Sequence, residues 1–162
     1  MTPAEFKTIR ERLGLTAQAF GFLLPRKVRE RTVRYWESGG QPIPDDAGDF
    51  LLELDAFAEA QAANALAVVQ DATQAQGGPP ESLCLLRYAD DSDLPTAELR
   101  SLGAGFHSAM TGRVREALER AGVLVRIVYY DKPACGAWLR AQDLRNDAAG
   151  RSAWAAEQAG LN

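Results

Sequence analysis

The chain is poor in the residues from which metal and redox sites are built. It has one histidine and two cysteines among 162 residues, and Cys84 and Cys135 lie far apart without a paired spacing. This composition argues against a zinc site, so we expect no metal and no cofactor. His107 has no serine, cysteine or carboxylate at a recognisable catalytic spacing. We therefore expect that the protein is not an enzyme.

Long apolar runs are also missing. No run approaches the roughly 18 residues needed to span a bilayer, so we expect no membrane partner. The N-terminal stretch MTPAEFKTIRERLG is charged within its first turn, which is unlike a secretory signal. The apolar fraction of 46% and the charged fraction of 25% are ordinary for a folded protein. These features predict a reduced, cytoplasmic protein.

Positive charge is scarce over most of the chain but abundant near its start. The formal net charge is −4, yet residues 1–44 hold eight basic and four acidic side chains, a local charge of +4. Residues 45–162 carry the opposite excess, with ten basic and eighteen acidic side chains. Such asymmetry suggests that the N-terminal part meets a polyanion and that the remainder does not.

Three short helices are predicted within the basic segment. The first begins with the capping box of Thr2–Glu5 and ends at Gly14. Thr16 caps a second helix, and Pro25 either closes that helix or interrupts its last turn. A third helix is expected from about Val28 to Ser38, although it lacks a serine or threonine cap at its start. Helix, turn and helix within about 25 residues, with a basic second member, is the plan of the DNA-binding helix-turn-helix.

The remainder of the chain predicts a small α/β part. A long helix follows Asp45 and Asp46, and QGGPP at residues 76–80 reads as a linker. The later elements are expected as a strand (82–88), a helix (96–122), a strand (123–130) and two helices in the tail (132–162). The two strands suit a parallel pair with a helical crossover. Because two strands rarely form a stable sheet alone, we expect a second copy of the chain to complete or cover the sheet.

The fold class is therefore mainly α with a small α/β part. The predicted domains are residues 1–76, a helix-turn-helix DNA-binding domain with a long connecting helix, and residues 82–162, a C-terminal α/β dimerisation domain. In this interpretation the long helix joins a reading module to a pairing module.

The third helix has the two faces that a DNA-reading helix needs. Val33 and Trp36 fall on one side and are expected in the core, while Arg31 and Arg34 fall on the other. Arginine suits base edges as well as phosphates. Tyr35 either stacks on a sugar or folds back on its own helix. The residues that we expect at DNA are Gln18, Arg26, Lys27, Arg29, Arg31, Thr32, Arg34, Tyr35 and Ser38.

The stretches IRERLGLTAQAF and RTVRYWESGGQPIP resemble the Xre/lambda-repressor-type helix-turn-helix over about 45 residues. The resemblance implies an ion pair between Arg10 of the first helix and Glu37 of the third. If that pair is partly exposed, it contributes at most roughly 1 kcal/mol. Where the family often has a glutamine after the helix-capping threonine, this chain has Ala17, and Gln18 follows. The turn before the third helix is longer than is usual in the family.

The longer pattern, from YWESG through IPDD to a long helix, a strand, a helix and a strand, is similar to a subgroup with a C-terminal dimerisation domain. That subgroup includes the anti-CRISPR-associated autorepressors. The resemblance implies a homodimeric transcriptional regulator, acting on its own operon, that reads an inverted repeat in double-stranded DNA.

Our main hypothesis is a sequence-specific, homodimeric DNA-binding repressor. Three alternatives stay open. The first is an antitoxin that binds a toxin through its C-terminal half, and the second is an enzyme or ligand sensor built on the α/β region. The third is an RNA-binding regulator that uses the same basic helix.

Overall fold

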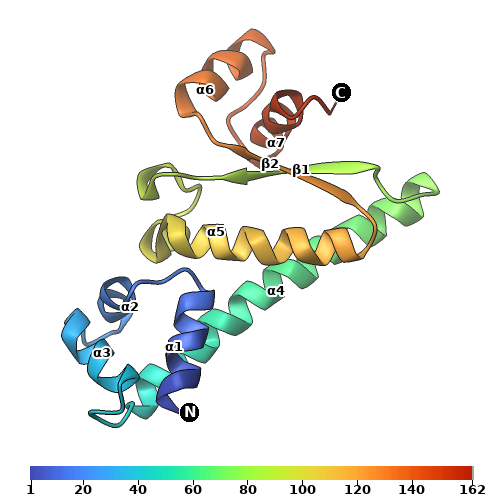
Figure 1. Ribbon diagram of the computed structural model, residues 1–162. Coiled ribbons are helices and arrows are strands. Elements are labelled where there is room, and N and C mark those ends of the chain that lie inside the picture. The colour runs from blue at the N-terminus through green and yellow to red at the C-terminus, as the bar shows by residue number, and fades with distance from the viewer. Residues whose placement is uncertain (162) are drawn as a thin grey trace.

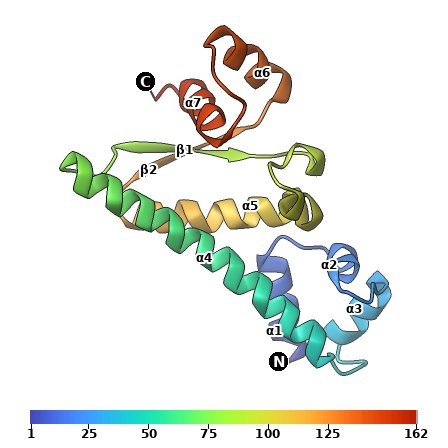
Figure 2. The same ribbon diagram turned by 180° about the vertical axis from the view of Figure 1, so that it is seen from behind.

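The computed structural model describes residues 1–161 as a mainly helical protein with a small two-stranded parallel sheet (Figures 1 and 2). This agrees with the fold class predicted from the sequence. The elements are α1 (Pro3–Arg12), α2 (Ala17–Leu23), α3 (Glu30–Glu37), α4 (Asp45–Gln76), β1 (Ser82–Arg87), a 3-10 turn (Asp91–Asp93), α5 (Ala97–Arg120), β2 (Leu124–Tyr129), α6 (Lys132–Ala141) and α7 (Ala148–Gln158). No helix within this described range has the length and apolar character required to cross a membrane.

The starts of α1 and α2 and the end of α1 lie where the sequence predicts them. Thr2 and Glu5 form the reciprocal capping box of α1, and the Thr16 hydroxyl accepts a hydrogen bond from the backbone of Ala19 at the start of α2. Gly14 and Gly39 follow α1 and α3 with left-handed φ angles of 67° and 74°, a conformation that glycine adopts without strain. Local capping chemistry therefore sets these boundaries.

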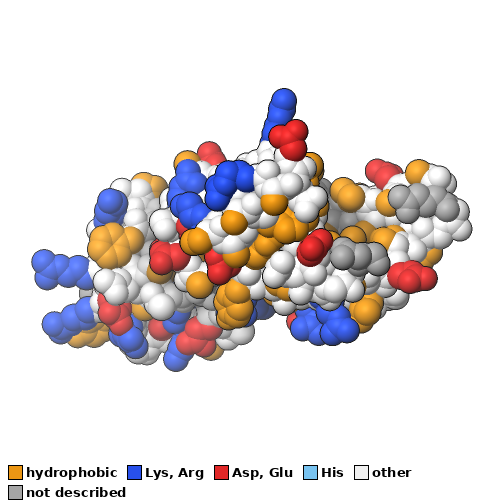
Figure 3. Space-filling model, turned by 90° about the horizontal axis from the view of Figure 1, so that it is seen from above, with side chains coloured by type: hydrophobic (Ala, Val, Ile, Leu, Met, Phe, Trp, Pro, Cys, Tyr) orange, Lys and Arg blue, Asp and Glu red, His pale blue; other side chains and the backbone are white. Residues whose placement is uncertain are grey.

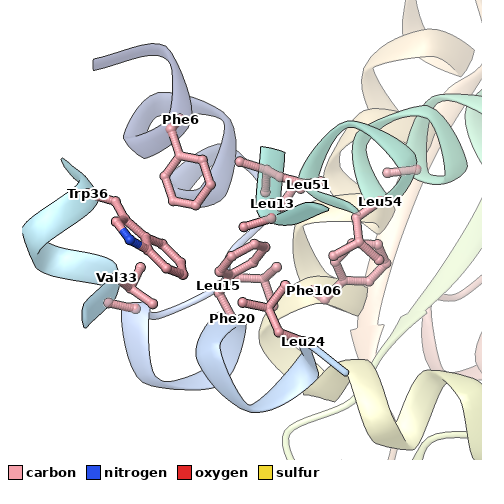
Figure 4. Packing of buried hydrophobic residues seen from close by; sticks show 13 residues of the cluster. Phe6, Leu13, Leu15, Phe20, Leu24, Val33, Trp36, Leu51, Leu54 and Phe106 are labelled. Carbon is pink, nitrogen blue, oxygen red and sulfur yellow. The ribbon is translucent and has the colours of Figure 1, made fainter. Parts of the chain in front are cut away.

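Helices α1 to α3 pack with the first half of α4 around one aromatic cluster (Figure 4). Phe6 lies at its centre, with its ring edge-on to Phe20 at 5.3 Å and to Trp36 at 6.2 Å between ring centroids. Leu51 and Leu54 of α4 close the cluster. Burial of these side chains is the main favourable contribution to the stability of this part of the chain.

Helix α5 reaches from the C-terminal half into this N-terminal cluster. Phe106 of α5 is buried there, stacked on Phe57 of α4 with ring centroids 6.2 Å apart. The backbones meet next to it, because a Cβ atom at Gly14 would lie only 2.3 Å from the carbonyl oxygen of Gly105. The two predicted domains therefore share a hydrophobic cluster and a close backbone contact.

A charged network joins α1, α4 and α5 beside that contact. Asp55 of α4 accepts a hydrogen bond from Arg12 on one carboxylate oxygen and from Arg113 on the other, each at 2.5 Å. Burial raises the pKa of the Asp55 carboxyl, but the hydrogen bonds and charges of Arg113 and Arg12 outweigh this effect and hold the pKa below its ordinary value. The carboxylate is therefore ionised at neutral pH and links the three helices.

The sheet lies between two helical layers. Strands β1 and β2 are parallel, with Ser82 beside Leu124 and Arg87 beside Tyr129, which confirms the predicted pairing. One face packs on α4 and α5, and the other packs on α6 and α7, where Trp154 is buried. The crossover helix α5 is interrupted at Gly103, whose φ of 89° and ψ of 162° are not helical.

Candidate nucleic-acid interface

Helix α3 presents opposite faces to the core and to solvent. Val33 is fully buried and Trp36 is 3% exposed, whereas Arg31, Arg34 and Tyr35 are exposed. The helix is shorter than predicted because its first helical residue is Glu30 and its last is Glu37. As expected, no side chain caps its start, so no side chain accepts from its first backbone N–H groups.

The loop between α2 and α3 displays further positive charge on a fixed backbone. Leu24 is buried and Val28 packs on the N-terminal cluster, which leaves Arg26, Lys27 and Arg29 pointing to solvent. The Val28 N–H donates to the Gly21 carbonyl at 3.0 Å. A Cβ at Gly21 would lie 2.5 Å from the Val28 carbonyl oxygen, so this close approach requires glycine.

Together these five cations form what we call the basic surface: Arg26, Lys27, Arg29, Arg31 and Arg34. Figure 3 shows lysine and arginine side chains gathered at the left-hand end of the molecule, the end at which Figure 1 places α2 and α3. Within the described residues, the one ion pair between this surface and the acidic remainder of the chain is the exposed pair of Arg26 and Asp46, at 3.7 Å. Such a pair contributes little, so it leaves Arg26 available to another anion.

Two contacts within α3 orient its arginines. The Arg31 guanidinium lies over the Tyr35 ring, 5.3 Å from its centroid, and Nη2 donates to the Tyr35 hydroxyl at 2.9 Å. Tyr35 thus folds back on its own helix, one of the two arrangements that the sequence left open. Arg34 donates to the Glu30 carboxylate from Nε at 2.8 Å and from Nη2 at 2.5 Å. Both partners are exposed, so another acceptor displaces Glu30 at a cost of only tenths of a kcal/mol, about 0.3–0.5.

The remaining predicted residues lie around the same corner of the molecule. Gln18 is exposed on α2, and Thr32 is half-buried on α3. The Ser38 hydroxyl donates to the Tyr35 carbonyl at 3.1 Å, so its proton is used at the end of α3. Phe22 was not predicted, yet it is 59% exposed on α2. Its position one turn after Gln18, on the face opposite Phe20, is the sequence signal that identifies it.

The ion pair between Arg10 and Glu37 is present, but it is more buried than the sequence analysis assumed. Arg10 Nε lies 2.5 Å from Glu37 Oε1, and each side chain is 7% exposed. Arg10 also donates to the Leu15 carbonyl, at the turn between α1 and α2. The small contribution to stability expected of a partly exposed pair therefore does not apply to this pair. Removing one member leaves a charge in the protein interior.

His107, the single histidine of the chain, lies in a region separate from the basic surface. His107 is buried, with its ring edge-on to Tyr88 at 5.1 Å and Nδ1 3.3 Å from the Thr111 hydroxyl. Burial lowers the pKa of His107, so the ring is neutral at physiological pH. It borders an open cavity of about 260 Å³ between β1, α4, α5 and α7. Among residues 1–161, no three histidine, cysteine or acidic side chains gather as metal ligands would.

No protein-family model matches the chain. No curated protein matches it either. The geometry of the basic surface and the residues that form it are therefore the main indication of function.

Proposed function

We propose that the protein is a homodimeric, sequence-specific DNA-binding regulator of transcription, a repressor that inserts α3 into the major groove. The observation that supports this best is the division of α3 into a buried apolar face and an exposed cationic face. A major groove is wide enough for one helix, and such a helix needs one face for its own domain and another for the DNA. α2 precedes α3 and packs against it, as the first helix of a helix-turn-helix does.

Each part of the basic surface has a distinct role in this proposal. Arg31 and Arg34 reach the base edges, where a guanidinium binds guanine O6 and N7 with two hydrogen bonds. Arg26, Lys27 and Arg29 bind backbone phosphates on either side, assisted by the uncapped start of α3. Gln18 and Phe22 on α2 lie toward the sugar-phosphate backbone. The stacking of Arg31 on Tyr35 restricts its guanidinium before DNA arrives, which reduces the entropy lost on binding.

The resemblance to Xre-type regulators supports the same function. The residues that carry it include Arg10 and Glu37, which form a buried ion pair between the first and third helices. Two-fold symmetry would place the two copies of α3 about 34 Å apart on an inverted repeat. In this proposal the protein binds and does not catalyse. An antitoxin would use the same DNA surface and differ in the partner of its C-terminal half.

Selection of bound fragments from random duplex DNA, followed by titration of the best fragment, tests the proposal. We expect a palindromic sequence with half-sites one helical turn apart. Three loop cations in each of two copies give six phosphate contacts, so affinity should fall about a thousandfold between roughly 50 and 200 mM salt. Recovery of no common sequence, together with no binding at low salt, would contradict the proposal. Tighter binding to hairpin RNA than to duplex DNA would favour the RNA-binding alternative.

Arg34→Ala should weaken binding to the selected fragment by about 1–3 kcal/mol, since it removes a side chain expected at a base edge. Arg120→Ala is the matched control, because Arg120 is also an exposed helical arginine paired with a glutamate four residues away. The control should bind DNA as the unchanged protein does, and both variants should melt within a few degrees of it. Equal affinities for the two variants would argue against a role of Arg34 at DNA.

A further inference from the structure

The small sheet has a free edge at β2. Within residues 1–161, β2 pairs with β1 alone. Figure 1 shows β2 on the near side of β1, and Figure 2 shows it behind β1, so its second edge faces away from α4. An uncovered edge strand presents unpaired N–H and C=O groups and readily pairs with another strand.

The backbone groups at this edge can be assigned from the parallel pairing. The N–H groups of Leu124 and Tyr130 donate to β1, at 3.3 Å and 2.9 Å. Because successive residues of a strand point their backbone groups to alternate sides, the N–H and C=O groups of Val125, Ile127 and Tyr129 point outward. The free edge therefore offers three donors and three acceptors in a regular row.

Large apolar side chains flank this edge on both faces of the sheet, with Ile127 and Tyr129 on the α5 side and Leu124 on the other. Leu124 is 51% exposed, Ile127 36% and Tyr129 62%. Other exposed apolar residues are scattered over the protein, but these three belong to one six-residue strand. Regular unpaired backbone with exposed apolar side chains on both faces is what a strand-pairing surface requires.

We infer that β2 pairs antiparallel with β2 of a second copy of this chain, about a two-fold axis at Ile127, to form a continuous four-stranded sheet. In this register the two Ile127 residues exchange both backbone hydrogen bonds, and Val125 lies opposite Tyr129 of the second copy. Arg126 then lies opposite Val128. A register centred on Arg126 would instead place two guanidiniums opposite one another, which is unfavourable.

The surroundings of the edge favour a second copy over an unrelated peptide. The groove of about 340 Å³ beside Ile127 is lined by two bases, Arg87 and Arg115, and two acids, Glu116 and Glu119. A two-fold axis brings equal numbers of both signs together, whereas a peptide of one sign would meet like charges. The inference rests on the proposed function in one respect: a palindromic DNA site requires two copies of α3 and therefore a dimer. The free edge is independent of DNA.

Ile127→Glu in the full-length chain tests this inference by sedimentation equilibrium without DNA. The unchanged protein should be a dimer at micromolar concentration, and the variant should dimerise at least tenfold more weakly, because two carboxylates would lie opposite each other at the axis. Leu144→Glu is the control, since Leu144 is also an exposed apolar residue, 46% exposed, but outside β2. It should remain dimeric. An unchanged protein that stays monomeric, or an Ile127→Glu variant that dimerises normally, overturns the inference.

Ile127→Cys provides a second test, which introduces no charge at the edge of the sheet. Facing residues in a hydrogen-bonded antiparallel pair have Cα atoms about 5.5 Å apart, which is within the range of a disulfide. Mild oxidation should therefore give a covalent dimer with Ile127→Cys and none with Leu144→Cys. Burial raises the pKa of the native Cys84 and Cys135 thiols, which slows their oxidation. No covalent dimer with Ile127→Cys would exclude this register.

The two proposals fail separately in these experiments. A dimer that is lost in Ile127→Glu but never binds DNA would refute the proposed function and leave the pairing intact. A monomer that binds a single half-site would refute the pairing and support the DNA-reading role of α3. A monomer that instead recruits a toxin through β2 would overturn the pairing with a second copy and favour the antitoxin alternative.

Discussion

Trp36→Ala is expected to lower the free energy of unfolding by about 3–5 kcal/mol, the usual cost of removing a buried tryptophan. Trp36 is 3% exposed and packs edge-on against Phe6, so its loss leaves a cavity between α1 and α3. A domain of this size is typically stable by only about 5–15 kcal/mol. Urea unfolding followed by circular dichroism measures the change directly.

Tyr35→Ala is the matched control for this variant, because Tyr35 is the adjacent aromatic residue of α3 but is 41% exposed. Its stability should change by about 0.5 kcal/mol or less. If Trp36→Ala kept its stability within about 1 kcal/mol and yet lost DNA affinity, the indole would be a ligand contact instead of a core group. The division of α3 into two faces would then be wrong.

The sequence predicted most element boundaries because short-range chemistry determines them. Thr2, Thr16 and Gly14 act on backbone groups within a few residues of themselves, so a local pattern contains the whole signal. The start of α3 was placed too early because a contact that is not local determines it. Val28 is held in the loop by its hydrogen bond to Gly21, and this contact across two elements leaves no mark at Val28 itself.

Contacts between distant elements were harder to predict. The sequence placed Phe106 within the predicted helix of residues 96–122, but it did not indicate that Phe106 packs against the N-terminal cluster. Gly105, in the same helix, allows the backbone of Gly14 to approach closely, and the pattern around Gly105 does not reveal this contact. The role of Asp55 between Arg12 and Arg113 also requires three helices to be placed in space.

For the candidate site, the sequence correctly indicated which side chains are exposed. It did not indicate which residues those side chains contact. The helical spacing of Val33 and Trp36 fixes the buried face of α3 and therefore the opposite, cationic face. The partners of Arg31 and Arg34 within the helix depend on rotamers, which a pattern does not contain. Phe22 was missed because an apolar residue in a short helix is ordinarily assigned to the core.

Glu37→Leu should lower the free energy of unfolding by about 3–5 kcal/mol, because it leaves the buried Arg10 without its carboxylate. Arg10 would keep its hydrogen bond to the Leu15 carbonyl and a distant contact of 3.4 Å with Glu11. Neither replaces a carboxylate at 2.5 Å in the interior. Thermal and urea unfolding of the single variant measure the loss.

The double variant Arg10→Met with Glu37→Leu separates two effects on stability, that of the unpaired buried charge and that of the lost packing. Because it leaves no buried charge, it should be more stable than Glu37→Leu alone, although the Leu15 carbonyl loses a donor at a cost of about 1–3 kcal/mol. The exposed pair Arg115–Glu119 is the control, and its two alanine substitutions should couple by only about 0.3–0.5 kcal/mol. If the effects at Arg10 and Glu37 were simply additive, the pair would contribute no more than a surface ion pair. The attachment of α3 to α1 would then depend on Phe6 and Trp36 alone.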